Sequence, residues 1–410
     1  MDVLPVPGVE GQKEEAGAEG GAVYVPKSKD DDLAAAIPLP LSQRWKKWVV
    51  RTITTWTLIG VFALIVNQGP VAISVTIVGL QFLAFREVVS IGYAWNQEKH
   101  LPLFRVQQWY FLFVALFLLY GRNTLVWGET NVWGGSEATP NALLWVRDHY
   151  TFVAFCAWAL GLVVVVLTLH PQTLRYQLAQ FALTHMCLLL VVFPIIFVVR
   201  NTFNGLFWFL LPSTLIFVND ITAYMWGFHF GKTPLIQLSP KKTWEGFIGG
   251  GFCTLLWGFY FPLFLVKYGW IICPRAAPEC AVSWAFLPRE YSFSIGETDY
   301  FTTTLLPVQF HGLFLAVFAS VVAPFGGFFA SGVKRAYKLK DFANLLPGHG
   351  GIIDRVDCQF LMALFTYTFY INFVERYDPS VQEIVATLRN LSAGDFAAVA
   401  SAMPALCNSN

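Results

Sequence analysis

Long apolar stretches alternate with short polar ones along most of this chain. From Trp48 onward, the apolar runs have lengths near the roughly 20 residues that a helix needs to cross a bilayer. We count about nine such runs, of which the third and sixth are short. They centre on Val49–Val66, Val71–Phe85, Trp109–Tyr120, Thr151–Leu169, Phe181–Val199, Gly205–Val218, Phe247–Val266, Leu313–Ala330 and Gln359–Val374. The pattern predicts an all-α, polytopic integral membrane protein with about nine transmembrane helices.

The composition agrees with a membrane protein, because 56% of the 410 residues are hydrophobic and 13% are charged. Residues 1–45 differ, since they carry two acidic clusters and no long apolar run. We expect them to form a disordered cytosolic tail rather than a transit or signal peptide. The rest divides into N-terminal transmembrane helices at 46–218, a transmembrane region with two polar loops at 219–374, and a C-terminal tail at 375–410.

Basic residues predict how the spans are oriented. Arg44, Lys46, Lys47 and Arg51 surround the start of the first span, which favours a cytosolic location for this end. On this count, the loops after the second, fourth, sixth and eighth spans also face the cytosol. The long loop 267–310 and the C-terminal tail then face the opposite side.

Two cysteines in that long loop form a candidate disulfide. Cys273 and Cys280 bracket the sequence Pro-Arg-Ala-Ala-Pro-Glu. A bridge can form there if the compartment is oxidising. Two free thiols are the alternative, and the sequence leaves both open.

The most polar segment of the second region is Ser331–Asp357, which holds five Lys/Arg and three Asp between two apolar runs. Its basic side chains suit polyphosphate oxygens, because fixed positive charges screen an anion that water would otherwise solvate. They are Lys334, Arg335, Lys338 and Lys340. An ordinary basic cytosolic loop would explain these residues, but not the glycines and paired acids beside them.

Those glycines and acids complete the segment. Pro347-Gly348-His349-Gly350-Gly351 is unsuited to a helix, and its glycines would let backbone N–H groups approach an oxyanion closely. Asp354 and Asp357 follow at a spacing of i and i+3, which places both carboxylates on one helical face. This pair is a candidate edge of a divalent-metal site.

A second polar cluster lies between the sixth and seventh spans. Asp220 ends an apolar run, where an acidic residue is costly enough to indicate function. The sequence Ser239-Pro-Lys-Lys-Thr-Trp-Glu-Gly246 leads into the seventh span, with Thr243 as the expected N-cap. The first turn of that helix, beside Lys241 and Lys242, would form an anion site. An interfacial helix start with snorkelling lysines is the structural alternative.

Both clusters resemble the signatures of the phosphatidate cytidylyltransferases, also called CDP-diacylglycerol synthases. Family members carry Asp-x-x-Ala-Tyr and Ser-Pro-x-Lys-Thr-Trp-x-Gly-Phe, and further on Ser, Lys-Arg, Lys-Asp, Pro-x-His-Gly-Gly and Asp-Arg-x-Asp. The matching residues are Asp220, Ala223-Tyr224, Ser239-Pro240, Lys242–Trp244, Gly246-Phe247, Ser331, Lys334-Arg335, Lys340-Asp341, Pro347, His349–Gly351, Asp354-Arg355 and Asp357. Gly327 is a departure from many bacterial members, which have an acidic residue there, whereas eukaryotic members look like this chain.

The resemblance implies an enzyme that condenses CTP with phosphatidic acid to CDP-diacylglycerol and pyrophosphate in phospholipid biosynthesis. The expected catalytic residues are Lys334, Arg335, Lys340, Asp341, His349 and Arg355. The expected substrate-binding residues are Ser239, Lys241, Lys242, Thr243, Gly350 and Gly351. The expected cofactor is Mg²⁺, held by Asp220, Asp354 and Asp357. Because Gly327 cannot be a ligand, a further carboxylate is needed, and Asp220 is preferred to Asp341 because it closes a span at the depth of the helix that starts near Asp354.

The chemistry that this activity needs is mostly electrostatic. A phosphate monoester is largely dianionic at neutral pH, so the site must screen charge and align the reactants rather than supply a strong base. Arg355 is expected to point away from the face shared by Asp354 and Asp357. The expected partners are CTP, phosphatidic acid and the bilayer, in the endoplasmic reticulum membrane with the active site facing the cytosol. A homodimer is left open.

Two other functions are alternatives. One is a CTP-dependent polyprenol kinase, and the other is a multispan transporter whose intramembrane Asp220 and basic loops bind an anionic solute.

The sequence has no Cys/His set with zinc spacing, and no Walker or Rossmann glycine pattern. The net charge of +1 disfavours nucleic-acid binding. His185, in an apolar span, is expected to be a hydrogen-bonded core residue.

Overall fold

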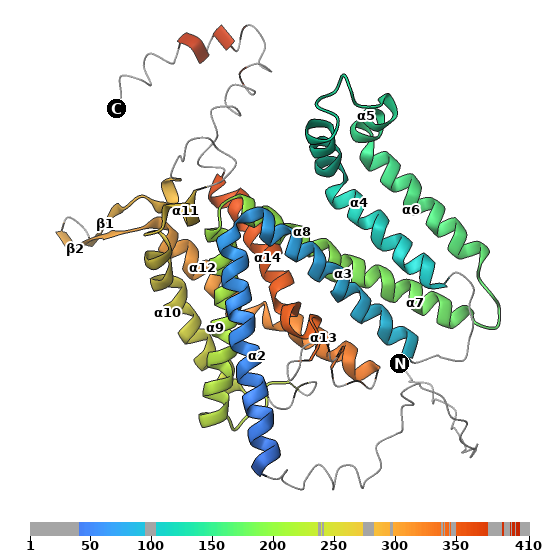
Figure 1. The fold of residues 1–410 in the computed structure, drawn as a ribbon. Helices are drawn as coiled ribbons and strands as arrows, with labels where there is room; N and C mark the ends of the chain where they lie inside the picture. The colour runs from blue at the N-terminus through green and yellow to red at the C-terminus, as the bar shows by residue number, and fades with distance from the viewer. Residues whose placement is uncertain are drawn as a thin grey trace, which may run out of the picture. The chain divides into compact units, whose positions relative to one another are not determined.

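The chain is almost entirely helical wherever the computed structural model describes it (Figure 1). It divides into two compact units, Met1–Val50 and Arg51–Asn410, and the packing reported below lies within the second. The described residues are 41–94, 104–236, 239, 242–273, 283–295, 298–337, 339, 341–343, 345, 350–375, 388, 394, 396, 397 and 399–401.

The helices follow the apolar runs of the sequence. The first half of the chain contains α2 (Leu41–Gln68), α3 (Pro70–Ala94), α4 (Phe104–Asn131), α5 (Asn141–Asp148), α6 (Tyr150–Leu167), α7 (Leu174–Cys187), the π-helical turn η1 (Leu188–Val192) and α8 (Phe193–Phe203). The second half contains α9 (Phe207–Phe230), α10 (Trp244–Leu265), α11 (Gly269–Ile272), the 3₁₀ turn η2 (Trp284–Phe286), α12 (Pro307–Val321), α13 (Pro324–Ala336) and α14 (Ile353–Phe373).

Seven helical segments in the described part of the chain are long and apolar enough to cross a membrane. They are Pro70–Ser90, Arg105–Asn131, Tyr150–Leu167, Leu174–Phe203, Phe207–Phe230, Trp244–Leu265 and Pro307–Ala336. These segments coincide with seven of the predicted runs, so the membrane-protein class is confirmed. The other two predicted runs fall on the shorter apolar helix Thr52–Gln68 and on α14, whose first turns are charged. A total of about nine spans therefore stays a prediction.

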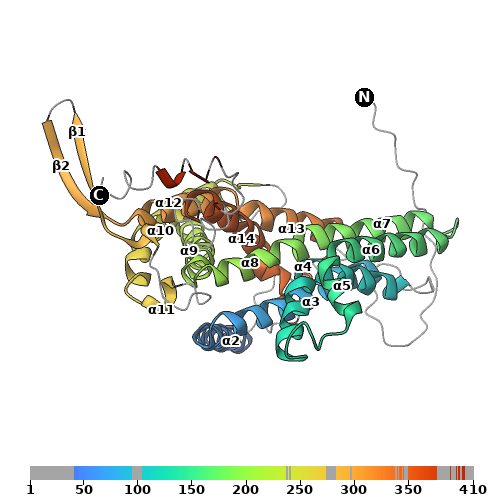
Figure 2. The same cartoon turned by 90° about the horizontal axis from the view of Figure 1, so that it is seen from above.

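Small residues allow α9, α10 and α12 to pack closely side by side (Figures 1 and 2). A Cβ atom added to Gly250 of α10 would lie 2.7 Å from the Cβ of Ala223 on α9. Two turns further along α10, a Cβ at Gly258 would lie 2.6 Å from the carbonyl oxygen of Gly312 on α12. Close backbone approach of this kind is the usual way for helices to associate in a bilayer.

The charged segment before α14 is attached to a second apolar core. Phe342, Ile352 and Ile353 are buried in a cluster that includes Phe85 of α3 and Leu112 of α4. Residues more than 200 positions apart in the chain therefore meet beside the motif segment. This contact places α3 next to the start of α14.

An antiparallel hairpin departs from the all-α prediction. β1 (Arg289–Ile295) pairs with β2 (Thr298–Leu305), and both views show the hairpin extending beyond the ends of α10 and α12 (Figures 1 and 2). Its signal is visible in the sequence, because Tyr291, Phe293 and Ile295 alternate with serines, and a threonine-rich stretch follows Gly296.

Two of the expectations about single residues can be compared with the structure. Cys273 is disulfide-bonded, whereas its partner lies outside the described residues, so pairing with Cys280 stays a prediction. His185 is hydrogen-bonded, as predicted, because its Nε2 accepts a bond of 3.2 Å from the indole of Trp158, although the residue is half-buried rather than in the core.

Candidate functional site

The two polar clusters of the sequence meet in the folded chain. Lys242, in the connection between α9 and α10, places its Nζ 4.5 Å from the ring centroid of Phe328 on α13. The same ammonium group interacts electrostatically with Asp220 of α9 and with Asp357 of α14. Side chains from α9, α13 and α14 and from the α9–α10 connection therefore surround one charged site.

Asp220 and Asp357 form the acidic part of this site. Their carboxylates are close enough to repel each other, and Lys242 and Arg355 supply the compensating positive charge. Asp357 is half-buried, whereas Asp220, Lys242 and Arg355 are exposed. The four side chains thus form a charge-balanced group that is open to a ligand, and we call it the carboxylate–cation site.

Glycines bring α13 against α14 at this site. A Cβ at Gly326 would lie 2.8 Å from the carbonyl oxygen of Asp357, and one at Gly327 would lie 3.3 Å from the Oδ2 atom of Asp357. An acidic side chain at position 327 would therefore be adjacent to the Asp357 carboxylate. Gly327, where this chain departs from the bacterial pattern, therefore lies at the site.

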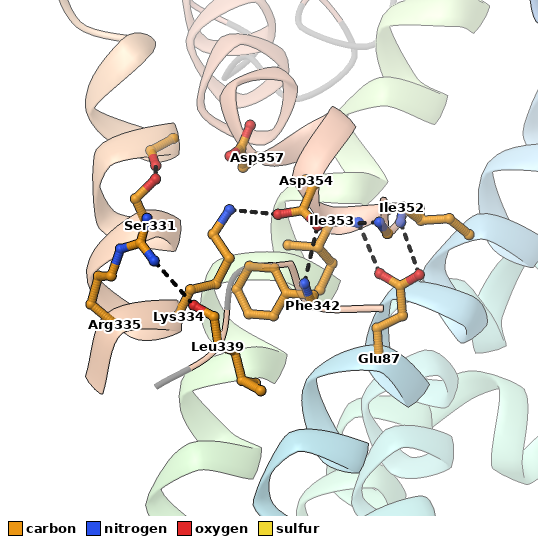
Figure 3. Close-up of polar contacts among 12 residues, drawn as sticks. Glu87, Ser331, Lys334, Arg335, Leu339, Phe342, Ile352, Ile353, Asp354 and Asp357 are labelled. Atoms are coloured by element: carbon orange, nitrogen blue, oxygen red, sulfur yellow. Dashed lines mark hydrogen bonds and ion pairs between the residues drawn. The ribbon is translucent and has the colours of Figure 1, made fainter. Parts of the chain in front are cut away.

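Asp354 belongs to a different arrangement (Figure 3). Its Oδ1 lies 2.6 Å from Nζ of Lys334, and the side chains of this ion pair are only 6% and 14% exposed. Its Oδ2 accepts hydrogen bonds of 3.1 Å from the amide of Phe342 and 3.2 Å from the amide of Gly351. Both oxygens are occupied by protein donors, so Asp354 fastens the motif segment to α13.

Two residues have contacts in the structure while their predicted roles stay predictions. The amide of Gly351, predicted to approach a substrate oxyanion, donates to Asp354. The guanidinium of Arg355, predicted to point away from the acidic face of α14, interacts electrostatically with Asp220 of α9. Because Asp354 and Asp357 have different surroundings, the i, i+3 spacing does not direct both carboxylates to one centre.

The connection between α9 and α10 is held by its own hydrogen bonds. Thr243 is the N-cap of α10, as predicted, because its Oγ1 accepts a bond of 3.2 Å from the amide of Gly246. The amide of Lys242 donates to the carbonyl oxygen of Ser239 at 3.0 Å. Glu245, in the first turn of α10, accepts a hydrogen bond of 2.5 Å from the hydroxyl group of Thr233. These bonds fix the backbone that carries Lys242.

The remaining predicted residues lie around the motif segment or outside the described part. Arg335 is exposed and donates to the carbonyl oxygen of Leu339 at 3.4 Å. A Cβ at Gly350 would lie 3.5 Å from Oδ1 of Asp341, so these two residues are neighbours. Lys241, Lys340 and His349 lie outside the described residues.

A buried acidic residue that the sequence analysis missed lies beside the same segment. Glu87 of α3 is 6% exposed and accepts hydrogen bonds from the amides of Ile352 and Ile353 (Figure 3). The criterion that singled out Asp220, an acid at the end of an apolar run, applies equally to Glu87. It could therefore have been found from the sequence.

The donor set can be tested for its fit to Mg²⁺. Among the described residues, no group of three or more His, Cys, Asp and Glu side chains is suitably placed to hold a metal ion. Asp220, Asp354 and Asp357 are therefore not one cluster. The pair Asp220 and Asp357 nevertheless fits this ion, because Mg²⁺ is usually bound through one or two carboxylates together with substrate phosphates and water.

Helices of this length define a polytopic membrane protein, whose charged site takes Asp220 from well inside α9, rather than from its end as the sequence predicted, and Asp357 from the second turn of α14. The chain belongs to the cytidylyltransferase family, whose match covers residues 49–373. It is 42% identical over 351 residues to a Rattus norvegicus protein named phosphatidate cytidylyltransferase 1, covering 83% of this chain and 75% of the relative. An Arabidopsis thaliana protein with the same name is 39% identical over 366 residues, which cover 87% of each chain. The resemblance seen in the sequence is confirmed at the level of the family.

Proposed function

We propose that this protein transfers a cytidylyl group from CTP to phosphatidic acid, with CDP-diacylglycerol and pyrophosphate as products. The similarity to the rat and Arabidopsis phosphatidate cytidylyltransferases supports the substrates. The observation that carries the proposal is the carboxylate–cation site, in which accessible positive and negative side chains from both family motifs meet. A membrane protein needs such a site to bind a triphosphate beside a lipid phosphate.

The reaction requires little covalent chemistry from the protein. A phosphate oxygen of phosphatidic acid attacks the α-phosphorus of CTP, and the bond from that phosphorus to the bridging oxygen breaks to release pyrophosphate. The attacking phosphate is largely dianionic at neutral pH, so no strong general base is needed. Charge neutralisation and in-line alignment supply the catalysis.

The residues of the carboxylate–cation site divide this work. Lys242 and Arg355 neutralise phosphate oxygens, because a lysine acts as a point charge and an arginine can bind two oxygens at once. Asp220 and Asp357 would hold Mg²⁺, which, when bound, screens the negative charge of the phosphates. The shielded pair of Lys334 and Asp354 keeps α13 joined to the motif segment that precedes Asp357.

Product analysis tests the proposed reaction directly. Purified protein in mixed micelles is incubated with phosphatidic acid and CTP labelled in the cytosine ring, and the lipids are separated by thin-layer chromatography. A labelled CDP-lipid and an equal amount of pyrophosphate are expected. If a prenol becomes phosphorylated by CTP labelled at the γ-phosphate instead, the protein is a kinase. If neither a labelled CDP-lipid nor a phosphorylated prenol forms, the result favours the transporter.

We also propose that the site faces the cytosol, where CTP is available, in the endoplasmic reticulum membrane. The basic residues before the first span and in the motif loops support this orientation. Single cysteines introduced near Lys241 and Lys338 should both react with an impermeant thiol reagent from the cytosolic side of sealed vesicles. Labelling from opposite sides would contradict a shared site.

A further inference from the structure

We infer that Glu87 is a positioning residue for this reaction: it fixes the first turn of α14 and thereby the placement of Asp354 and Asp357. Its Oε1 lies 2.8 Å from the amide nitrogen of Ile352, and its Oε2 lies 3.1 Å from that of Ile353. Glu87 and these two residues are 265 and 266 positions apart in sequence. Only the expected effect on the reaction rate rests on the proposed function; the structural role does not.

The chemistry of a helix start explains why a carboxylate is suited to this place. The first N–H groups of a helix have no partner inside the helix and carry the positive end of its dipole. A carboxylate that accepts two of them satisfies both donors and offsets the partial positive charge. Since Glu87 is 6% exposed, water does not replace it readily if it is removed. The start of α14 therefore depends on a side chain of α3.

Gly351 provides independent support for this role. A Cβ at this glycine would lie 2.7 Å from Oε2 of Glu87 and 3.1 Å from the amide nitrogen of Ala343. The backbone of Gly350 has φ = +80°, which favours glycine, whereas Gly351 has no such conformation. The first glycine of the pair is thus required for its conformation, and the second because Glu87 occupies the space that a side chain would need.

Glu87 and Asp354 together accept hydrogen bonds from four amides of the motif segment. Asp354 accepts from Phe342 and Gly351, and Glu87 accepts from the next two residues, Ile352 and Ile353. These four amides thus hold the segment in place. A shift of about 1 Å in such a segment can lower a rate by about 100-fold.

Amide exchange and kinetics on two variants test this inference. Glu87→Gln keeps one acceptor and Glu87→Ala keeps none, so amide hydrogen exchange in residues 350–357 should accelerate progressively in the two variants. With CTP and phosphatidic acid, kcat should fall about 10-fold in Glu87→Gln and about 100-fold in Glu87→Ala, with KM for CTP changing less than threefold. Gln81→Leu is the matched control, because Gln81 is buried on the same helix but donates to Val192.

A double-mutant cycle adds a second readout. Gly351→Ala should impair the wild-type chain more than the Glu87→Ala chain, because removal of the glutamate frees part of the space. Additive effects would overturn the steric argument. The positioning role would be overturned if the Glu87 variants keep a normal kcat, or if Gln81→Leu raises exchange at 350–357 equally. Exchange is measured without substrate, so a failure of the proposed reaction would leave that part of the test intact.

Discussion

Nζ of Lys334 and Oδ1 of Asp354 lie 2.6 Å apart, with both side chains largely shielded from solvent. The pair joins the last turn of α13 to the first turn of α14. Removing one partner of a buried ion pair leaves an uncompensated charge, which typically costs about 3–5 kcal/mol of unfolding free energy. The two residues thus stabilise the segment between the helices.

Asp354→Asn should therefore lower the thermal stability of the protein. The expected loss is about 3 kcal/mol or more, measured by thermal unfolding in detergent micelles. Arg335→Met is the matched control, because Arg335 is exposed on the same helix as Lys334 and should change stability little. Unchanged stability together with a lost Mg²⁺ response in Asp354→Asn would restore the original assignment of this residue as a metal ligand.

The two carboxylates of the carboxylate–cation site should behave differently from Asp354. Asp220→Asn and Asp357→Asn keep side-chain size but remove the charge that would balance a divalent cation. Product formation should fall by about 100-fold or more, with a larger Mg²⁺ concentration needed for half-maximal rate. A Mg²⁺ titration of cytidylyl transfer measures this. Glu137→Gln, at an exposed glutamate, should titrate like the wild type. A wild-type titration in Asp220→Asn would remove that residue from the metal site.

Lys242 should contribute to CTP binding. Lys242→Met keeps most of the side-chain volume but removes the ammonium group that faces Asp220 and Asp357. Loss of a hydrogen bond to a charged group costs about 1.5–3 kcal/mol, so kcat/KM for CTP should fall roughly 10- to 100-fold. Lys232→Met is the control, since Lys232 is exposed and is held only through its backbone amide, which donates to Glu245. Equal effects of the two substitutions would show that Lys242 acts only through bulk charge.

The disulfide of Cys273 should join it to Cys280. Non-reducing digestion of protein taken from its native membrane should yield one linked pair of peptides that separates after reduction, as read by mass spectrometry. A link from Cys273 to any other cysteine, with Cys280 alkylated as a free thiol, would contradict this pairing.

The sequence predicted the helices well because their signals are local. A run such as Phe247–Val266 has the length and polarity of a span, and Thr243 has the side chain of an N-cap, so α10 was predicted almost to the residue. The hairpin of β1 and β2 was missed because an all-helical expectation was applied to a loop with alternating apolar and polar residues.

The arrangement of the site was harder to predict, because it depends on contacts between distant helices. Spacing alone placed Asp354 and Asp357 on one helical face, but the side chains that they meet come from elsewhere in the chain. Lys334 engages Asp354, whereas Asp357 faces Asp220. Glu87 could have been noted as an acid at the end of an apolar run, but its bonds to α14 become visible only when α3 lies beside the start of that helix.

The contact between Lys334 and Asp354 also closes a loop, since the two residues are 20 positions apart. The entropy of closing such a loop changes slowly with its length, by about 0.6 kcal/mol for each doubling. Length changes between the two helices therefore cost little in loop-closure entropy. A one-residue insertion within α13 ahead of Lys334 is different, because it would turn the lysine by about 100° around the helix axis. The bonded positions limit the loop instead, so relatives and engineered variants should tolerate length changes only where these leave Lys334 on its face of α13 and the amides of Phe342 and Gly351 against Asp354.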